Sequence, residues 1–302
     1  AQLAAGDMPV EVSFAPELLS RLRGRGVTRE RSVRMLSLFW QARRAYYFIV
    51  GGLTGVSPSM RRLREALWND VFTHESARYE RLLWDRLEDF SVILRGATGS
   101  GKGQAAAAIG RSGFVPFDEG AMTFQTSFTD LFVPINLSQF PETLIESELF
   151  GHKKGAFTGA VDSHVGVFSH CRPHGAIFLD EIGEVSIPVQ IKLLRVLQDR
   201  VFTPVGSHEE RRFEGRVIAA THRDLDEARR ERRFRNDFYY RLCSDVIEVP
   251  PLHVRLAEDP RELSVLVSHL VERIVGQKDE EVVGRVIEVV QTNLPPEYAW
   301  PG

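Results

Sequence analysis

Five short apolar runs alternate along the chain with longer segments whose apolar residues recur at helical spacing. The runs are residues 91–94, 132–135, 176–179, 217–220 and 246–249. Uninterrupted apolar runs of this length are typical of strands buried on both faces, and helices between them are typical of parallel sheets. The pattern therefore predicts an α/β fold in which helices flank a parallel five-stranded sheet. Pro134 cannot donate a ladder hydrogen bond, so we expect its strand to lie at an edge of the sheet.

Helical periodicity extends toward both ends of the chain. An Arg-dense stretch, residues 21–44, has apolar residues at helical spacing and predicts one helix near the N-terminus. We interpret its arginines as a solvated basic face; a surface for nucleic acid or a protein partner is the less favoured interpretation. Four further helices are predicted, two before the sheet and two that begin a smaller helical domain after it: residues 57–67, 79–87, 263–275 and 280–292.

Composition and charge narrow the functional classes. The 302 residues are 43% hydrophobic and 26% charged, as in an ordinary globular protein, and the net charge of −3 gives no overall attraction to nucleic acid. Cys171 and Cys243 show neither metal-site spacing nor a disulfide framework, so we expect a cytoplasmic protein. The longest apolar run, residues 45–50, is too short to cross a bilayer, so we expect no membrane partner. Because the chain begins without Met and stops at Trp300-Pro301-Gly302, we expect a fragment of a longer protein.

A glycine-rich loop lies between the first predicted strand and an Ala-rich helix. It has the G-x-x-x-x-G-K pattern in the strand–loop–helix context of phosphate-binding loops. Its glycines let backbone N–H groups surround phosphates, and its Lys supplies positive charge for the β and γ phosphates. The residues predicted to contact a nucleotide are Gly96, Ala97, Thr98, Gly99, Ser100, Gly101, Lys102, Gly103 and Gln104. The alternative, a glycine-rich turn without a ligand, is disfavoured by this context.

Two pairs of polar residues end predicted strands. Asp180 and Glu181 follow the third run, and carboxylates at the end of a buried strand are costly without a cation or a partner. We therefore predict that Asp180 holds Mg²⁺ and that Glu181 polarises the attacking water; a pair that caps a helix N-terminus is the alternative. Thr221 and His222 follow the fourth run, where a polar side chain can sense the γ phosphate. A plain surface position is the alternative for His222.

Two further segments suggest contacts outside the nucleotide site. Arg235 and Arg241 lie in a charged stretch, and phosphoryl transfer gains greatly from an arginine supplied across an interface. Two ordinary surface arginines are the alternative. A second segment joins flexible glycines to one aromatic ring and one hydroxyl: Gly155, Ala156, Phe157, Thr158, Gly159 and Ala160. Its Phe157 cannot bury itself among small neighbours and is expected to pack on its own domain or a partner; an ordinary turn anchored by Phe is the alternative.

Together these motifs resemble the AAA+ domain of bacterial sigma-54-dependent transcription activators, the enhancer-binding proteins. The resemblance extends from about Ile49 to the last residue. Besides the phosphate-binding loop and the hexapeptide 155–160, it rests on residues 146–152, 178–184, 190–198, 217–225, 234–242 and 300–302. The hexapeptide is nearly diagnostic of this family, so the resemblance is specific.

The resemblance implies a division of the chain and a mechanism. Residues 1–48 are expected to be a helical linker or the end of a regulatory region, residues 49–250 an AAA+ P-loop NTPase subdomain, and residues 251–302 a truncated helical lid. Members form rings, usually hexameric, that hydrolyse ATP with Mg²⁺ between neighbouring subunits. They remodel the sigma-54 RNA polymerase closed complex toward the open complex through the loop that here carries Phe157 and Thr158.

The resemblance also implies roles for residues that no local pattern explains. By position, Arg235 and Arg241 match arginine fingers that reach the next subunit's nucleotide. Asn136 matches a residue that restrains the catalytic Glu, here Glu181. Residues 205–213 match a second loop beside the first. Promoter-upstream DNA would be bound only through a C-terminal domain outside this chain.

Three departures from the family pattern leave other functions open. His222 stands where the family has Asn. Gly103 stands where the family usually has Glu, and it lacks the hydroxyl that often meets Mg²⁺, a place that water can take. Extra residues at 68–86 and 114–129 indicate an atypical branch. The alternatives are a nucleotide-gated AAA+ binding module with weak hydrolysis and an AAA+ remodeller of another protein.

Overall fold

A five-stranded parallel sheet forms the centre of the computed structural model, which describes residues 8–295, 298 and 300. Its order is β4-β5-β8-β1-β9, and every neighbouring pair is parallel. The strands are β1 (Val92–Arg95), β4 (Phe132–Asn136), β5 (Ala176–Asp180), β8 (Arg216–Thr221) and β9 (Asp245–Glu248). They coincide with the five predicted runs, so the predicted α/β fold is confirmed. Pro134 lies on the edge strand β4, as expected.

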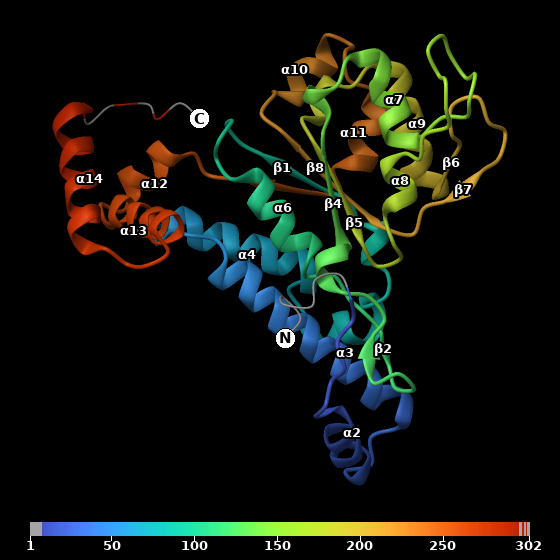
Figure 1. The fold of residues 1–302 in the computed structure, drawn as a ribbon, viewed down its shortest axis with the longest axis horizontal. Helices are drawn as coiled ribbons and strands as arrows, with labels where there is room; N and C mark the ends of the chain where they lie inside the picture. The colour runs from blue at the N-terminus through green and yellow to red at the C-terminus, as the bar shows by residue number, and fades with distance from the viewer. Residues whose placement is uncertain (1–7, 296–297, 299, 301–302) are drawn as a thin grey trace.

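Helices cover both faces of the sheet (Figure 1). On one face, Ile177 and Leu179 share a core with α7 (Glu142–Phe150), α8 (Val167–His170), α9 (Ile187–Asp199), α10 (Leu225–Arg230) and α11 (Asn236–Leu242). On the other face, Ala176 and Phe178 share a core with α4 (Pro58–Phe72) and α6 (Lys102–Gly110). Because successive strand residues point to opposite faces, both sets must be apolar, which explains the uninterrupted runs.

Short elements connect these layers. The short helical turns are α5 (Ser76–Arg78), η1 (Tyr46–Gly51), η2 (Tyr79–Leu83), η3 (Leu87–Asp89), η4 (Phe128–Leu131), η5 (Leu137–Gln139) and η6 (Ile182–Glu184). Two small antiparallel pairs lie outside the main sheet: β2 (Phe117–Asp118) with β3 (Thr123–Phe124), and β6 (Val201–Phe202) with β7 (Arg211–Arg212).

The prediction of a single helix over residues 21–44 is wrong. The segment divides between α2 (Ala15–Gly24) and α3 (Arg29–Ala45). Gly26 turns the chain between them at a φ of 85°, and the Thr28 hydroxyl accepts a hydrogen bond from the Arg31 N–H at the start of α3. The helix therefore breaks here, although the apolar periodicity continues, because glycines flank Arg25 and Thr28 caps the start of the next helix.

The solvated basic face is confirmed for some of these arginines and wrong for one. Arg21, Arg25, Arg29, Arg31 and Arg43 are exposed. Arg44 is buried, and its guanidinium donates to the main-chain carbonyls of residues 111 and 113, both at 2.6 Å. The buried guanidinium therefore satisfies two carbonyl groups just after the C-terminus of α6. A helical-wheel pattern does not reveal this contact.

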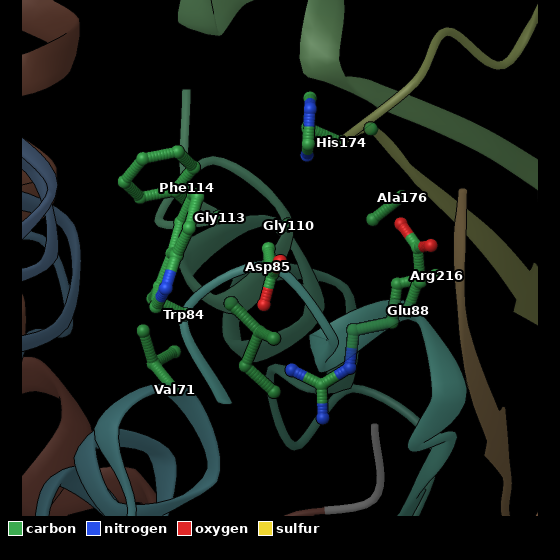
Figure 2. Close-up of a pocket in the computed structure, with 12 residues that line it drawn as sticks. Val71, Trp84, Asp85, Glu88, Gly110, Gly113, Phe114, His174, Ala176 and Arg216 are labelled. Carbon is green, nitrogen blue, oxygen red and sulfur yellow. The ribbon is translucent and has the colours of Figure 1, made fainter. Parts of the chain in front are cut away.

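The two extra segments, residues 68–86 and 114–129, meet at the amino-terminal edge of the sheet. The Trp84 and Phe114 rings, one from each segment, lie 4.7 Å apart in an edge-to-face arrangement. They line a small cavity of about 30 Å³, which Figure 2 shows with Trp84 and Phe114 on one side and Glu88 and Arg216 on the other. This contact fixes both segments against the starts of β5 and β8.

A buried ion pair joins the first extra segment to the sheet. Arg216, the first residue of β8, donates to Asp70 Oδ1 at 2.6 Å and to the Phe90 carbonyl at 2.8 Å. The two side chains are 9% and 2% exposed. Burial raises the pKa of the Asp70 carboxyl, and the Arg216 charge opposes this rise. The carboxylate therefore depends on its partner.

Replacing Arg216 by Met is expected to destabilise the fold by about 3–5 kcal/mol, because it leaves a buried carboxylate without its partner. The shift in the urea unfolding midpoint measures this. In the double variant Asp70→Leu, Arg216→Met most of the loss should be regained. Arg172→Met is the matched control: its ion pair with Asp130 is partly solvent-exposed and should contribute less than about 1 kcal/mol. An equal loss in both single variants would contradict the account.

In the described residues after the sheet, the chain forms α12 (Leu252–Glu258), α13 (Arg261–Val275) and α14 (Glu280–Asn293). The last two confirm the predicted helices. Glu262 is fully buried, accepts hydrogen bonds from the Val56 and Ser57 N–H groups, and pairs with Arg255. These contacts attach the helices to the loop before α4 (Figure 1). The family motif at the C-terminus, 300–302, lies largely outside the described residues. Within the described ranges no helix is long and apolar enough to span a membrane.

Candidate functional site

A cleft of about 730 Å³ opens at the carboxyl edge of the sheet, between the loop after β1 and helices α12–α14. Ligands of open α/β folds bind at this edge. Among the residues that line it are Asn136, Asp180 and Glu181 from the ends of two strands, together with residues 98–104. The opposite wall is apolar and comes from Leu263, Val267 and neighbouring residues of the C-terminal helices. The sequence thus predicted one wall of the cleft, whereas the apolar wall was missed.

The loop after β1 has the backbone that a phosphate cradle requires. Gly99 and Gly101 have φ values of 75° and 100°, which disfavour other residues. At Gly96, a Cβ would lie 2.6 Å from the Val249 carbonyl oxygen. Gly101 precedes α6, so the first N–H groups of that helix face the cleft. These are the features that favour anion binding at a helix N-terminus.

Two polar side chains of the loop could each form a hydrogen bond to a bound phosphate. The Lys102 ammonium donates to the carbonyls of Gly96 and Ala97 at 2.9 and 3.0 Å. Ser100 Oγ is buried and has no hydrogen-bond partner within the described part of the chain. A phosphate oxygen would satisfy both groups. At Gly103, in contrast, there is room for a side chain, since a Cβ there would contact only the Phe178 ring, at 3.9 Å.

Asp180 and Glu181 lie side by side at the end of β5. Burial and the Glu181 charge both raise the pKa of the Asp180 carboxyl, as expected for adjacent, partly buried carboxylates. Glu181 has left-handed backbone angles, φ 58° and ψ 46°, which are costly for a residue with a Cβ. Its N–H donates to Asp180 Oδ1 at 3.1 Å. This arrangement differs from a helix cap, because neither carboxylate accepts a bond from the N–H groups of η6.

The structure places His222, and not Asn136, against Glu181. His222 Nδ1 lies 2.7 Å from Glu181 Oε2, and the His222 N–H lies 3.4 Å from the same oxygen. Asn136 Oδ1 accepts hydrogen bonds from the Ser138 N–H and hydroxyl at 3.0 and 2.8 Å. Thr221 is fully buried, and its hydroxyl accepts from the Arg223 N–H at 3.1 Å. The roles predicted for Asn136, Thr221 and His222 stay predictions.

Arg235 and Arg241 do not line the cleft of their own chain. The Arg235 guanidinium pairs with Asp237, at 2.7 Å between Nη2 and Oδ2. The Arg241 guanidinium donates twice to the Leu197 carbonyl near the C-terminus of α9, at 3.0 and 2.8 Å. Both side chains come from α11 or its N-cap, on the sheet face opposite to α6. Within one chain they stand apart from the phosphate loop.

The hexapeptide loop extends from the end of α7 and is seated on a histidine. Phe157 is 38% exposed, and its ring packs edge-on against His152 at 4.9 Å. His152 Nδ1 lies 2.6 Å from the Ser147 hydroxyl on α7. Gly155 and Gly159 have φ values of 79° and 101°, which explains the two glycines. The Phe therefore packs partly on its own domain, one of the two outcomes expected.

The second predicted loop touches the first. At Gly206, which has a φ of 73°, a Cβ would lie 2.7 Å from the Cβ of Ala156. His152 also pairs with Val205 in a parallel bridge. Neither His152 nor Gly206 was singled out from the sequence. The Gly inside residues 205–213 was the available signal, because a close backbone approach often requires Gly.

Comparisons with known proteins agree with this geometry. A sequence model of the Sigma-54 interaction domain matches residues 76–248. The regulatory protein AtoC of Escherichia coli is 33% identical over 262 residues, covering 83% of this chain and 52% of AtoC. A Nif-specific regulatory protein of Bradyrhizobium diazoefficiens is 43% identical over 185 residues, covering 61% of this chain and 30% of that protein. The chain spans about half the length of these curated relatives, or less.

The fold also has solved counterparts. NtrX from Brucella abortus, in a crystal structure with ATP, has a TM-score of 0.56 at 24% identity and covers 73% of this chain and 42% of NtrX. At this identity the likeness concerns the fold alone. The sequence match is the stronger finding, since it includes the phosphate loop, Asp180, Glu181 and the hexapeptide. With more than half of its residues matched, this chain belongs to the family of proteins that carry the Sigma-54 interaction domain.

Proposed function

We propose that this chain is the ATP-hydrolysing part of a sigma-54-dependent transcription activator. The observation that carries the proposal is a single cleft that joins a phosphate-binding loop to Asp180 and Glu181, in a chain with the Sigma-54 interaction domain. Residues 49–250 would form the hydrolysing subdomain, and residues 251–302 would close over the nucleotide as a lid. Residues 1–48 would link it to a regulatory region.

The chemistry follows from the residues around the cleft. ATP phosphates would lie on the N–H groups of the loop and draw the Lys102 ammonium away from its two carbonyls. Asp180 fits Mg²⁺, which prefers oxygen ligands, because a cation would offset the burial and the neighbouring Glu181 charge that together raise the pKa of its carboxyl. When bound, the ion would neutralise charge on the phosphates. Glu181 would orient and polarise the attacking water.

The two arginines support a ring of identical subunits. Arg235 and Arg241 lie outside the cleft of their own chain, so they would stabilise the transition state only at a neighbour's nucleotide. A head-to-tail interface that repeats in this way gives a ring when the rotation from one subunit to the next closes. We propose a hexamer, as in the enhancer-binding proteins that the sequence resembles.

The loop with Phe157 would carry the motion to the transcription machinery. β4 ends at Asn136, which lines the cleft with the phosphate loop, and η5 and α7 follow it directly to Ser147 and His152. A nucleotide-driven shift of this segment would move the histidine on which Phe157 is seated. The released loop would bind sigma-54 in the RNA polymerase closed complex and promote open-complex formation. Promoter DNA would be held by other parts of the full-length protein.

Replacing Thr158 by Ala separates this proposal from plain ATP hydrolysis. The side chain lies on an exposed loop away from the cleft, so ATP turnover should stay within about twofold, while open-complex formation at a sigma-54 promoter should fall at least about tenfold. Permanganate footprinting of the promoter measures the second effect. Val161→Ala, just after the loop at a site 71% exposed, is the matched control and should leave both activities intact. Normal promoter opening with Thr158→Ala would remove the loop from its role.

One observation favours a second candidate function. Glu181 is engaged by His222, so a nucleotide-gated binding module with weak hydrolysis would also fit. A steady-state ATPase assay of the full-length protein, at rising protein concentration, distinguishes the two. Turnover that increases with assembly supports the ATP-hydrolysing role, and tight ATP binding with negligible turnover at every concentration supports the module.

A further inference from the structure

The backbone conformation of Glu181 does not by itself fix the orientation of its carboxylate. A left-handed residue with a Cβ costs about 1–3 kcal/mol and persists only where its surroundings determine it. Two backbone contacts hold the main chain of Glu181: its N–H donates to Asp180 Oδ1 at 3.1 Å, and its carbonyl accepts from the Glu184 N–H at 3.0 Å. Neither contact orients the side chain. Its only hydrogen-bond partner recorded among the described residues is His222.

We propose that His222 is the positioning residue for the Glu181 carboxylate, in place of the phosphate sensor that its location suggests; this rests on the proposed ATPase function. An ionised carboxylate can only accept, so His222 Nδ1 carries the proton and donates to Oε2 at 2.7 Å. The Glu181 side chain is 13% exposed and the His222 side chain 42%, so the carboxylate end of the bond is largely shielded while the ring remains open to solvent. With Oε2 fixed, Oε1 is the oxygen that acts on water.

The neighbouring candidates do not make this contact in the structure. Asn136, the residue expected beside Glu181, is held on its own turn, where its Oδ1 accepts from the N–H and hydroxyl of Ser138, and no hydrogen bond joins its side-chain amide to Glu181. The Thr221 hydroxyl is fully buried and faces the N–H of Arg223. His222 is one residue further along, where β8 has ended beside β5, which brings its ring across to Glu181. A base oriented by a third group is a recurring feature of hydrolytic sites.

The reach of the ring nitrogen gives a discriminating set of variants. Asn carries its amide nitrogen at the same number of bonds from the main chain as His Nδ1, whereas Gln carries it one bond further, near the reach of Nε2. His222→Asn should therefore keep the bond to Glu181. His222→Gln and His222→Ala should lose it. A residue that sensed phosphate through Nε2 would give the reverse order, with Gln the better substitute. Sensing by an Asn, the residue that the resembled family has at this position, would also allow rescue by His222→Asn, and a double-variant cycle in the nucleotide-free protein separates that case from positioning.

The experiment measures ATP turnover and KM for these three variants in the full-length protein. His222→Ala and His222→Gln should lower kcat by about 10–100-fold with KM changed less than about threefold, the effect of losing an orienting partner. His222→Asn should stay within about threefold of the natural protein. Unchanged kcat in His222→Ala, a loss confined to KM, or better rescue by Gln than by Asn would overturn the proposal.

A second readout does not depend on hydrolysis. In the nucleotide-free protein, the thermal midpoints of Glu181→Ala, His222→Ala and the double variant form a cycle that reports direct contact, because each single variant removes the bond. The double variant should shift the midpoint less than the sum of the single shifts. Strict additivity would overturn the positioning role even if the natural protein proved inactive as an ATPase. Absence of turnover with a non-additive cycle would instead count against the proposed function alone.

Discussion

Exchange of Glu181 for Gln is expected to lower ATP turnover by about 10²–10⁴-fold while ATP affinity stays within about threefold. Gln has the same shape and can still accept the bond from His222, but it cannot act as a base toward water. The phosphate loop and Asp180 are unchanged, so the nucleotide should bind normally. Single-turnover hydrolysis and equilibrium titration with a fluorescent ATP analogue measure the two quantities separately.

Glu184→Gln provides the matched control for this change. Glu184 lies one turn further along and pairs with Arg223 at 2.5 Å, without lining the cleft. ATP turnover by Glu184→Gln should stay within about twofold of the natural protein, since a partly exposed ion pair contributes little. Turnover by Glu181→Gln that matched this control would exclude Glu181 as the base.

Removal of Arg235 or Arg241 is expected to reduce ATP turnover by about 10³–10⁵-fold in the assembled protein, because each would stabilise transition-state charge at a neighbour's nucleotide. ATP affinity should change far less. Arg233→Ala is the matched control: this arginine is exposed, lies two residues before Arg235 and pairs with Glu231. It should have an effect below about twofold.

Mixing two inactive variants tests whether the arginines act between chains. Arg241→Ala chains keep the phosphate loop, and Lys102→Ala chains keep the arginines. In a one-to-one mixed ring, about one interface in four would combine both intact halves, so activity should reappear. Mixtures as inactive as their components, with ring assembly verified, would place the arginines in another role.

The sheet was the most predictable part of the fold. Strands buried on both faces must be apolar at every position, so each run identified its strand without knowledge of its partners. Pro134 even indicated an edge, because it lacks a ladder donor. The α2–α3 break was less accessible, since a turn around Gly26 and an N-cap at Thr28 interrupt a periodicity that continues across them.

Contacts between distant segments were beyond a pattern-based prediction. Arg44 reaches the carbonyls of residues 111 and 113, and Arg216 pairs with Asp70 across 146 positions. Both arginines are charged residues whose burial depends on acceptors that only the folded chain supplies. Motifs report which residue types are present, and they do not report which acceptor a long side chain will find.

The sequence indicated which residues line the candidate site, but not which side chains contact one another within it. The phosphate loop and the strand-end carboxylates share one cleft, because carboxyl ends of parallel strands meet at one edge. The contact between Glu181 and His222 depends on the relative rotation of two strand ends, which residue spacing does not encode. The seat of Phe157 on His152 depends on how the hexapeptide loop folds back.

Capture of sigma-54 by the full-length protein tests the central claim most directly. Immobilised protein would be incubated with purified sigma-54 under ATP, ADP, or ADP with aluminium fluoride as a mimic of the hydrolysis transition state. We predict retention with the mimic, at most weak retention with ADP, and loss of retention in Phe157→Ala despite normal ATP turnover. Equal retention under all three nucleotide conditions, or undiminished retention by Phe157→Ala, would contradict the account.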